Sequence, residues 1–279
     1  MRKLGVLLAL VVLGLLAPVT RVTPQPSTYR ILVGNDDGVR APGIVALAQA
    51  LKALGEVIVV APADNQSGKG HSITISDPIH REDFTLPGGI AATGLTATPV
   101  SALRVGLKKI VTTKPDLVVS GINRGYNLAL SSYLSGTVSV AREAAMQGIP
   151  AIASSLAAPA TMDYSAAAEA TVRIARFVKD RGLPDGVFLN VNVPAGTAAT
   201  WKGFMVTTQA LSAGGEEDFD VRTHPVTKRP YYWNMFKEGG GGPEGTDMWA
   251  VEHGYVSITP FRVGELDQPA FDRLKGAIR

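Results

Sequence analysis

Short apolar runs alternate with stretches of helical periodicity from residue 29 to residue 193, and this alternation limits the fold more than any other feature of the chain. Because the runs are nearly continuous, each strand is expected to be covered on both faces. The alternation therefore predicts an α/β fold with a mainly parallel sheet and helices on both of its faces. The expected strands are residues 29–34, 56–61, 115–120, 151–155 and 187–193, and the expected helices are residues 41–54, 99–112, 136–147 and 166–180.

The character of the chain changes beyond Pro194, where glycine, proline and charged residues become more frequent. We predict an α/β core over 28–200 and a β-rich C-terminal extension over 201–279 that completes the domain. The sequence Tyr231-Tyr232-Trp233 is expected to be a core strand in preference to a base-stacking platform. The other pieces predicted in the extension are strands at 205–208 and 255–259 and a final helix or tail at 270–279.

The first 27 residues have the pattern of a leader. A basic start at 1–3 precedes an apolar run at 4–17, and a polar, proline-rich stretch follows at 18–27. The run is shorter than the roughly 20 residues of a membrane-spanning helix. The pattern therefore predicts a signal peptide and export to the periplasm or beyond, with membrane attachment only if the leader stays uncleaved.

Composition excludes several classes of function. The chain has no cysteine, so disulfides, zinc-thiolate sites and thiol nucleophiles are excluded. The net charge is only +3 and no basic run occurs, so nothing supports binding to a nucleic-acid duplex. None of the four histidines is paired at helical metal-binding spacing. A bound metal is therefore expected to use oxygen ligands, which favours Mg²⁺, Mn²⁺ or Ca²⁺ over Zn²⁺.

Two adjacent carboxylates, Asp36 and Asp37, follow the first expected strand and precede Gly38. Two like charges so close repel each other, and a bound cation is the usual compensation. Ligands bind at the carboxyl ends of the strands in open α/β sheets. The pair therefore favours a metal site, although Asp36 or Asp37 could instead cap the following helix.

Other polar residues follow the next strands. Ser67, in the sequence Asn65-Gln66-Ser67-Gly68, and Asn123 could supply neutral oxygen ligands to the same ion, or could be ordinary turn residues. Ser135-Gly136-Thr137 precedes an expected helix, where it is either a phosphate-binding turn or a plain helix cap. His71 is a weak candidate for the acid that protonates a leaving group, and a structural role is favoured for it.

These motifs, taken in order, resemble those of the SurE family of 5′-nucleotidases and acid phosphatases. The resemblance extends over about residues 29–261. The matching motifs are Asn35-Asp36-Asp37-Gly38 with Ala41-Pro42-Gly43, Ala61-Pro62 with Asn65-Gln66-Ser67-Gly68, Ser120-Gly121-Ile122-Asn123, Ser135-Gly136-Thr137-Val138 with Glu143, and the segments 189–194, 231–233 and 244–247.

The resemblance implies a Rossmann-like three-layer αβα core, and an extension that builds homodimers or homotetramers by exchange between subunits. It also implies metal-dependent hydrolysis of nucleoside 5′- and 3′-monophosphates, with one divalent ion (Mg²⁺ or Mn²⁺, with Ca²⁺ an option in crystals) per subunit. The family's metal ligands correspond to Asp36, Asp37, Ser67 and Asn123. Its phosphate-binding turn corresponds to Ser135, Gly136 and Thr137, with Asn65 beside the site.

Three mechanisms or roles remain open at this stage. The first is attack on phosphorus by a water that the metal activates, with Asp36 and Asp37 as the catalytic residues. The second is a phospho-aspartyl enzyme in which one of these carboxylates is the nucleophile. The third is an exported nucleotide- or phosphate-binding protein with little turnover. It is motivated by the loop at 124–134, which lacks the second glycine and the acidic pair usual in the family.

Overall fold

The computed structural model describes residues 28–159, 161–212, 215–238 and 241–278. The predicted leader at 1–27 lies outside the described residues. No helix in the described part of the chain is long and apolar enough to cross a membrane.

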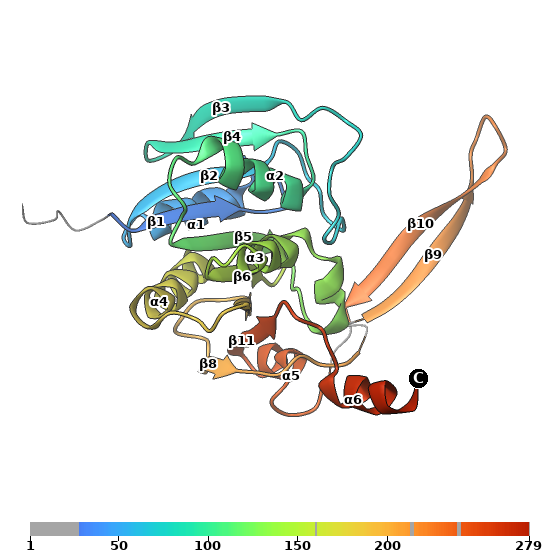
Figure 1. Cartoon of the computed structure of the whole chain (residues 1–279). Coiled ribbons are helices and arrows are strands. Elements are labelled where there is room, and N and C mark those ends of the chain that lie inside the picture. Colours follow the sequence, from blue (N-terminus) through green and yellow to red (C-terminus); the bar gives the residue numbers. More distant parts are fainter. Residues whose placement is uncertain (1–27, 160, 213–214, 239–240, 279) are drawn as a thin grey trace, which may run out of the picture.

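A nine-stranded sheet forms the centre of the molecule, and a separate two-stranded ribbon projects from it (Figure 1). The strands are β1 (Arg30–Gly34), β2 (Glu56–Pro62), β3 (Arg81–Leu86), β4 (Ile90–Leu95), β5 (Leu117–Arg124), β6 (Ala151–Leu156), β7 (Val187–Val193), β8 (Gly203–Val206), β9 (Gly215–Thr223), β10 (Pro230–Glu238) and β11 (Tyr255–Arg262). The helices are α1 (Pro42–Leu51), α2 (Pro99–Val105), η1 (Gly106–Ile110), η2 (Ala129–Leu134), α3 (Gly136–Met146), α4 (Ser165–Arg181), α5 (Asp247–Glu252) and α6 (Gln268–Ala277).

The strand order is β3-β4-β2-β1-β5-β6-β7-β11-β8. Strands β4, β2, β1, β5, β6 and β7 are parallel, which confirms the predicted mainly parallel sheet. From β1 the chain first adds β2 and then β4 on one side, and it later returns to place β5 on the other side of β1. The strand order therefore reverses between β1 and β5, and the crevice at the carboxyl ends of two such strands is where α/β sheets bind ligands.

Helices cover both faces of the sheet, which confirms the three-layer prediction (Figure 1). Successive side chains of β1 point to opposite faces. Ile31 and Val33 pack in the core cluster that contains α1 and α4, whereas Leu32 packs in the cluster that contains α2 and α3. Nearly continuous apolar strands are buried on both sides for this reason.

The structure corrects the expected elements in several places. The helix expected over 99–112 ends as α2 at Val105 and continues as the π-helical turn η1. The antiparallel pair β3–β4, strand β9 and helix α5 were not expected from the sequence pattern. Strands β8 and β11 join the main sheet, with β11 antiparallel to β7.

The expectation that Tyr231-Tyr232-Trp233 forms a core strand is wrong. These residues lie in β10, which pairs only with β9 among the described strands. More than half of the surface of Tyr232 and of Trp233 is exposed. Their β-forming character predicts a strand, but the sequence does not show whether either face of that strand is covered.

Candidate metal site at the carboxyl ends of β1 and β5

The two central strands bring three of the predicted ligands together. Gly34 is in register with Ser120 in the parallel pair β1–β5, so Asp36 and Asp37 leave β1 beside the end of β5. The backbone N–H of Arg124 donates to Asp37 Oδ2 at 3.2 Å, which places Asn123 next to this carboxylate. The edge of the sheet where the strand order reverses therefore carries the carboxylates of Asp36 and Asp37 and the amide of Asn123.

The loop after β2 brings the fourth predicted ligand to the same place. The N–H of Gln66 donates to the backbone oxygen of Asp36 at 2.7 Å. Asn65 accepts the N–H of Ser67 through its Oδ1 at 2.8 Å, in an Asx turn. Ser67 and Asn65 are both exposed. The loop therefore brings the Ser67 region beside Asp36, and the role of Ser67 as a ligand stays a prediction.

Asp36 is held by the first turn of α3. Its Oδ1 accepts the Thr137 hydroxyl at 2.5 Å, and its Oδ2 accepts the Gly136 N–H at 3.1 Å. Ser135 is the helix cap, because its hydroxyl accepts the Val138 N–H at 3.1 Å. The donors of Gly136 and Thr137 thus point at a carboxylate instead of being open, and the phosphate-binding role of this turn stays a prediction.

Neither aspartate caps the helix that follows β1. The cap residue of α1 is Ala41, and no side chain accepts a hydrogen bond from the first turn of that helix. The capping alternative for Asp36 and Asp37 is therefore wrong, and their pairing needs another explanation.

Burial and proximity both make the two negative charges unfavourable. Burial raises the pKa of Asp36, although the hydrogen bonds from Thr137 and Gly136 oppose that rise. Burial, and secondly the charge of Asp36, raise the pKa of Asp37 to about 6. A divalent cation would reverse the balance, because it favours the ionised form of both carboxylates.

The donor set fits a hard divalent ion. Asn123 donates its Nδ2 to the Gly125 carbonyl at 3.0 Å, and no described group donates to its Oδ1. Buried oxygens at the same strand ends, Asn35 Oδ1 and Ser120 Oγ, also have no partner among the described groups. The described residues contain no cluster of three or more His, Cys, Asp or Glu that could hold a metal. Two carboxylates with neutral oxygens and water suit Mg²⁺ or Mn²⁺ better than Zn²⁺.

The raised pKa of Asp37 predicts how metal binding depends on pH. Below about pH 6 the carboxyl is protonated, and it must lose that proton before it can bind a cation. We expect the dissociation constant for Mn²⁺ to rise at least tenfold for each pH unit below pH 6 and to level off above pH 7, because Asp36, whose pKa is also raised, must lose its proton as well. Calorimetric titration across pH measures this, and Asp37→Asn is expected to make the profile less steep. A pH-independent affinity between pH 5 and pH 7 would contradict the prediction.

Sequence reasoning missed the polar groups that hold the 124–134 loop. The N–H of Asn127 donates to Asn192 Oδ1, and the Asn127 carbonyl accepts the side-chain amides of Asn190 and Asn192. Asp247, which is fully buried, accepts the N–H of Ala129 at 2.8 Å. The alternation Asn-Val-Asn in a buried strand is the signal that could have revealed this role, because buried amides need partners.

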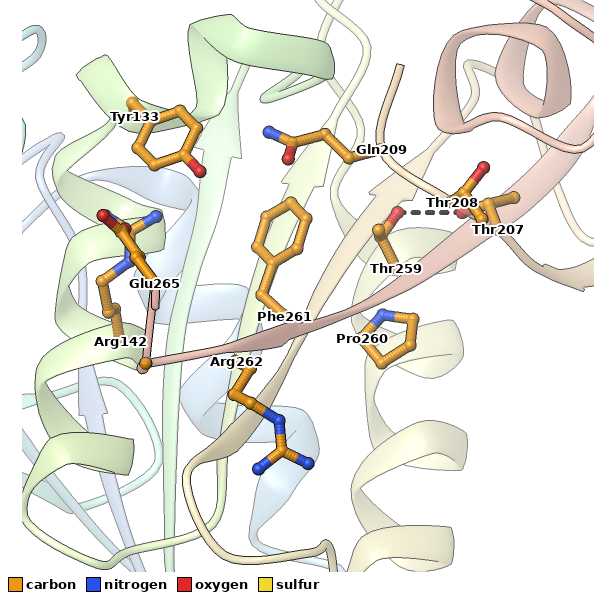
Figure 2. A pocket seen from close by; sticks show the side chains of 11 residues that line it. Tyr133, Arg142, Thr207, Thr208, Gln209, Thr259, Pro260, Phe261, Arg262 and Glu265 are labelled. Atoms are coloured by element: carbon orange, nitrogen blue, oxygen red, sulfur yellow. Dashed lines mark hydrogen bonds between the residues drawn. The ribbon is translucent and has the colours of Figure 1, made fainter. Parts of the chain in front are cut away.

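A pocket of about 550 Å³ opens between α3 and β11, away from these residues (Figure 2). The Arg142 guanidinium lies 5.0 Å from the centre of the Tyr133 ring in this pocket, and the hydroxyls of Thr207 and Thr259 are hydrogen-bonded. In the part of the chain that the structure describes, none of the predicted metal or phosphate residues lines the pocket. It is therefore a different region of the surface from the candidate metal site.

Comparisons with known proteins identify the family. Residues 31–215 match the family model described as "Survival protein SurE". The chain is 47% identical over 235 residues to 5′-nucleotidase SurE 1 of Thermus thermophilus, which covers 83% of this chain and 90% of that protein. It is 45% identical over 240 residues to 5′-nucleotidase SurE of Christiangramia forsetii, which covers 82% and 89% respectively.

A solved structure gives the same result. The crystal structure of SurE protein from Aquifex aeolicus superposes with a TM-score of 0.76 at 37% sequence identity, and the match covers 90% of this chain and all of that one. The fold, the order of the motifs and the relatives agree. The chain belongs to the SurE family.

Proposed function

We propose that the chain is a divalent-metal-dependent phosphomonoesterase that hydrolyses nucleoside 5′-monophosphates, and also 3′-monophosphates, with Mg²⁺ or Mn²⁺ as its ion. The observation that carries the proposal is the pair of carboxylates at the switch point between β1 and β5, which burial and mutual repulsion disfavour without a cation. Relatives that share most of the chain are named 5′-nucleotidases.

The residues of the site have separate tasks in this proposal. Asp36, Asp37, Asn123 and Ser67 would hold the ion. When bound, the ion lowers the pKa of water and neutralises charge on the phosphoryl oxygens. Asp37 carries the less buried of the two carboxylates, so it is the better placed of the two to take up the proton of the attacking water. The positive end of α3 lies at the same edge and favours anions there.

A substrate panel tests the function. Purified protein is incubated with nucleoside 5′- and 3′-monophosphates and each of Mg²⁺, Mn²⁺, Ca²⁺ and Zn²⁺, and phosphate release is measured before and after chelation. We expect release with Mn²⁺ or Mg²⁺, its loss with chelator and its return with added ion. Acid-quenched protein is expected to carry no phosphate by mass spectrometry, because water and not aspartate attacks phosphorus. Tight nucleotide binding without release would contradict the proposal.

We also propose that the β9–β10 ribbon docks onto a second copy of the chain. The ribbon stands apart from the main sheet (Figure 1). Tyr232 is in register with Val221, and every second side chain of a strand lies on the same face. Phe219, two residues from Val221, and Phe236, four residues from Tyr232, therefore share this face. All four are more than half exposed in the single chain. An isolated hairpin is at best marginally stable in water, so this apolar face indicates an oligomer interface.

Replacing one residue of this face is expected to break the assembly. A charge at position 232, as in Tyr232→Asp, would be desolvated in the interface, which is costly. We expect the molar mass from light scattering to fall from that of a dimer or tetramer to that of a monomer. Lys109→Glu, an exposed charge change on the η1 segment, is the control and is expected to leave the mass unchanged. A wild-type protein that is monomeric at all concentrations would overturn the proposal.

We further propose that the protein is exported, on the basis of the basic, apolar and polar order of residues 1–27. Fractionation of cells that express the full chain tests this, with mass spectrometry of the N-terminus. The expected result is protein in the periplasmic or extracellular fraction that has lost its apolar run. Intact protein confined to the cytoplasm would contradict it.

A further inference from the structure

A fully buried carboxylate in α3, that of Glu143, has no part in the proposed chemistry. It accepts hydrogen bonds from Arg104 Nε at 2.8 Å and Nη2 at 3.0 Å, on α2, and from Gln147 Nε2 at 2.9 Å, at the C-cap of α3. Its fourth contact is with His71 Nε2 at 3.0 Å. A buried charge with this many donors has its hydrogen-bonding needs met.

Glu143 is the anion of this network. Burial alone would raise its pKa, but the hydrogen bonds from His71, Arg104 and Gln147 outweigh burial and lower it to about 2. A carboxylate can only accept hydrogen bonds. His71 Nε2 must therefore carry the proton and donate it to Glu143, while the buried Nδ1 of the ring has no partner among the described groups.

His71 belongs to the loop between β2 and β3, which also carries Ser67. The side chains of Ser67, Lys69 and Ile73 are exposed, so few apolar contacts hold this loop down. The loop is also attached through the Gly70 N–H, which donates to the Leu134 carbonyl at 2.9 Å, and through Ser72 and Thr74, which are hydrogen-bonded to Thr98 and Ser101. The contact of His71 with Glu143 is the attachment that reaches a fully buried charge.

Helix α3 thus contacts two different segments of the candidate metal site. Its first turn holds Asp36 through Gly136 and Thr137. Two turns further along, Glu143 holds the loop that brings Ser67 beside Asp36.

We propose that His71 is a positioning residue, which donates to Glu143 and thereby fixes the 65–70 loop, with Ser67, against Asp36. The inference rests on the proposed function for its effect on turnover, but its structural part is independent of it. The contrasting explanation is that Glu143 only pairs α2 with α3 and that the His71 contact has no consequence for the site.

The test compares three variants by amide hydrogen exchange, Mn²⁺ titration and turnover. His71→Ala removes the donor, His71→Gln supplies a side-chain N–H in its place, and His80→Ala is the control. The side chain of His80 is exposed in the same connection between β2 and β3. Unlike Glu143, His71 can be replaced without leaving its partner bare, because Arg104 and Gln147 continue to donate to the carboxylate.

In His71→Ala we expect the protected amides of the 66–70 segment to exchange at least tenfold faster, while those of β1, β5 and α3 are unchanged. The dissociation constant for Mn²⁺ is expected to rise about tenfold and kcat/KM to fall at least tenfold, with Tm nearly unchanged. His71→Gln is expected to restore each value to within about threefold, and His80→Ala to match the wild type.

Unchanged exchange in the 66–70 segment of His71→Ala overturns the inference, as does a general loss of protection, which would indicate a purely structural role. Should the wild type show no phosphate release, the proposed function fails, and amide exchange with Mn²⁺ affinity still decides the role of His71. If the wild type binds no Mn²⁺ either, exchange alone decides it.

Discussion

Asp37→Asn is expected to remove nearly all turnover and at the same time to stabilise the metal-free protein. The variant loses one of two charged ligands, and we expect kcat/KM to fall by about 10²-fold or more, equivalent to about 3 kcal/mol of transition-state stabilisation. Its amide oxygen can still accept the Arg124 N–H. Because the buried, repelled charge is gone, the metal-free protein at pH 8 is expected to gain about 2 kcal/mol in its free energy of unfolding.

The sign of that stability change follows from the raised pKa. A carboxyl with a folded-state pKa of about 6 stabilises the fold while it is protonated, and this contribution is lost as the pH rises through 6. The wild type should therefore lose stability relative to Asp37→Asn between pH 4 and pH 7. Thermal unfolding in chelator across this range measures the difference, and turnover with Mn²⁺ is measured on the same samples.

Asp36→Asn provides a contrast, because both oxygens of Asp36 accept hydrogen bonds. One of its two donors, the Gly136 N–H or the Thr137 hydroxyl, would face the new amide group. This variant is expected to lose activity and to lose about 1–3 kcal/mol of stability. Asp185→Asn, an exposed aspartate between α4 and β7, is the control for both. Turnover within tenfold of the wild type in Asp37→Asn would rule out the proposed ligand role.

The core of the fold could be predicted because each of its strands carries its own signal. Residues 187–193 form β7 as expected, since the run contains three valines and is ended by Pro194. Helix α3 begins at Gly136 as expected, because Ser135 caps it. Parallel strands alternate with helices along the chain, so local patterns and the order of the elements together give the three-layer core.

The remaining elements could not be predicted because their strands are polar or depend on distant partners. Strand β3 contains Arg81, Glu82 and Asp83, and it exists only through its pairing with β4. The β9–β10 ribbon has strand-forming residues, but no described part of the chain covers its exposed apolar side chains. Whether such residues form a strand depends on these contacts more than on the local sequence.

The sequence predicted that Asp36, Asp37 and Asn123 lie together at one edge of the sheet, but not the hydrogen bonds that they make. Strand ends place Asp36, Asp37 and Asn123 at one edge, and that follows from the α/β pattern. The Gly136 N–H and the Thr137 hydroxyl donate to Asp36. A serine-glycine-threonine turn does not predict this contact, because such a turn is equally compatible with a bound anion. The meeting of two segments a hundred residues apart depends on the packed sheet.

Gly136→Ala is expected to abolish activity by displacing Asp36. A Cβ atom at position 136 would lie 2.7 Å from Asp36 Cβ, 2.9 Å from Asp36 Oδ2 and 2.8 Å from Pro99 Cγ. None of these atoms is the free end of a flexible side chain, so the carboxylate or the first turn of α3 must move. A misplacement of about 1 Å can cost about 10²-fold in rate, and we expect a loss of that size in kcat/KM with weaker Mn²⁺ binding.

Stability separates this steric effect from a simple change in helix propensity. Alanine is the better helix former by about 1 kcal/mol, so with open space at position 136 the variant would be more stable. Overpacking instead predicts a loss of about 1–3 kcal/mol in the free energy of unfolding. Gly264→Ala is the matched control, since a Cβ there meets no atom within 4 Å and the backbone does not need a positive φ. If Gly136→Ala keeps the turnover, Mn²⁺ affinity and Tm of the wild type, the contact between Asp36 and α3 can shift without consequence. Asp36 is then not held at the place where the reaction occurs.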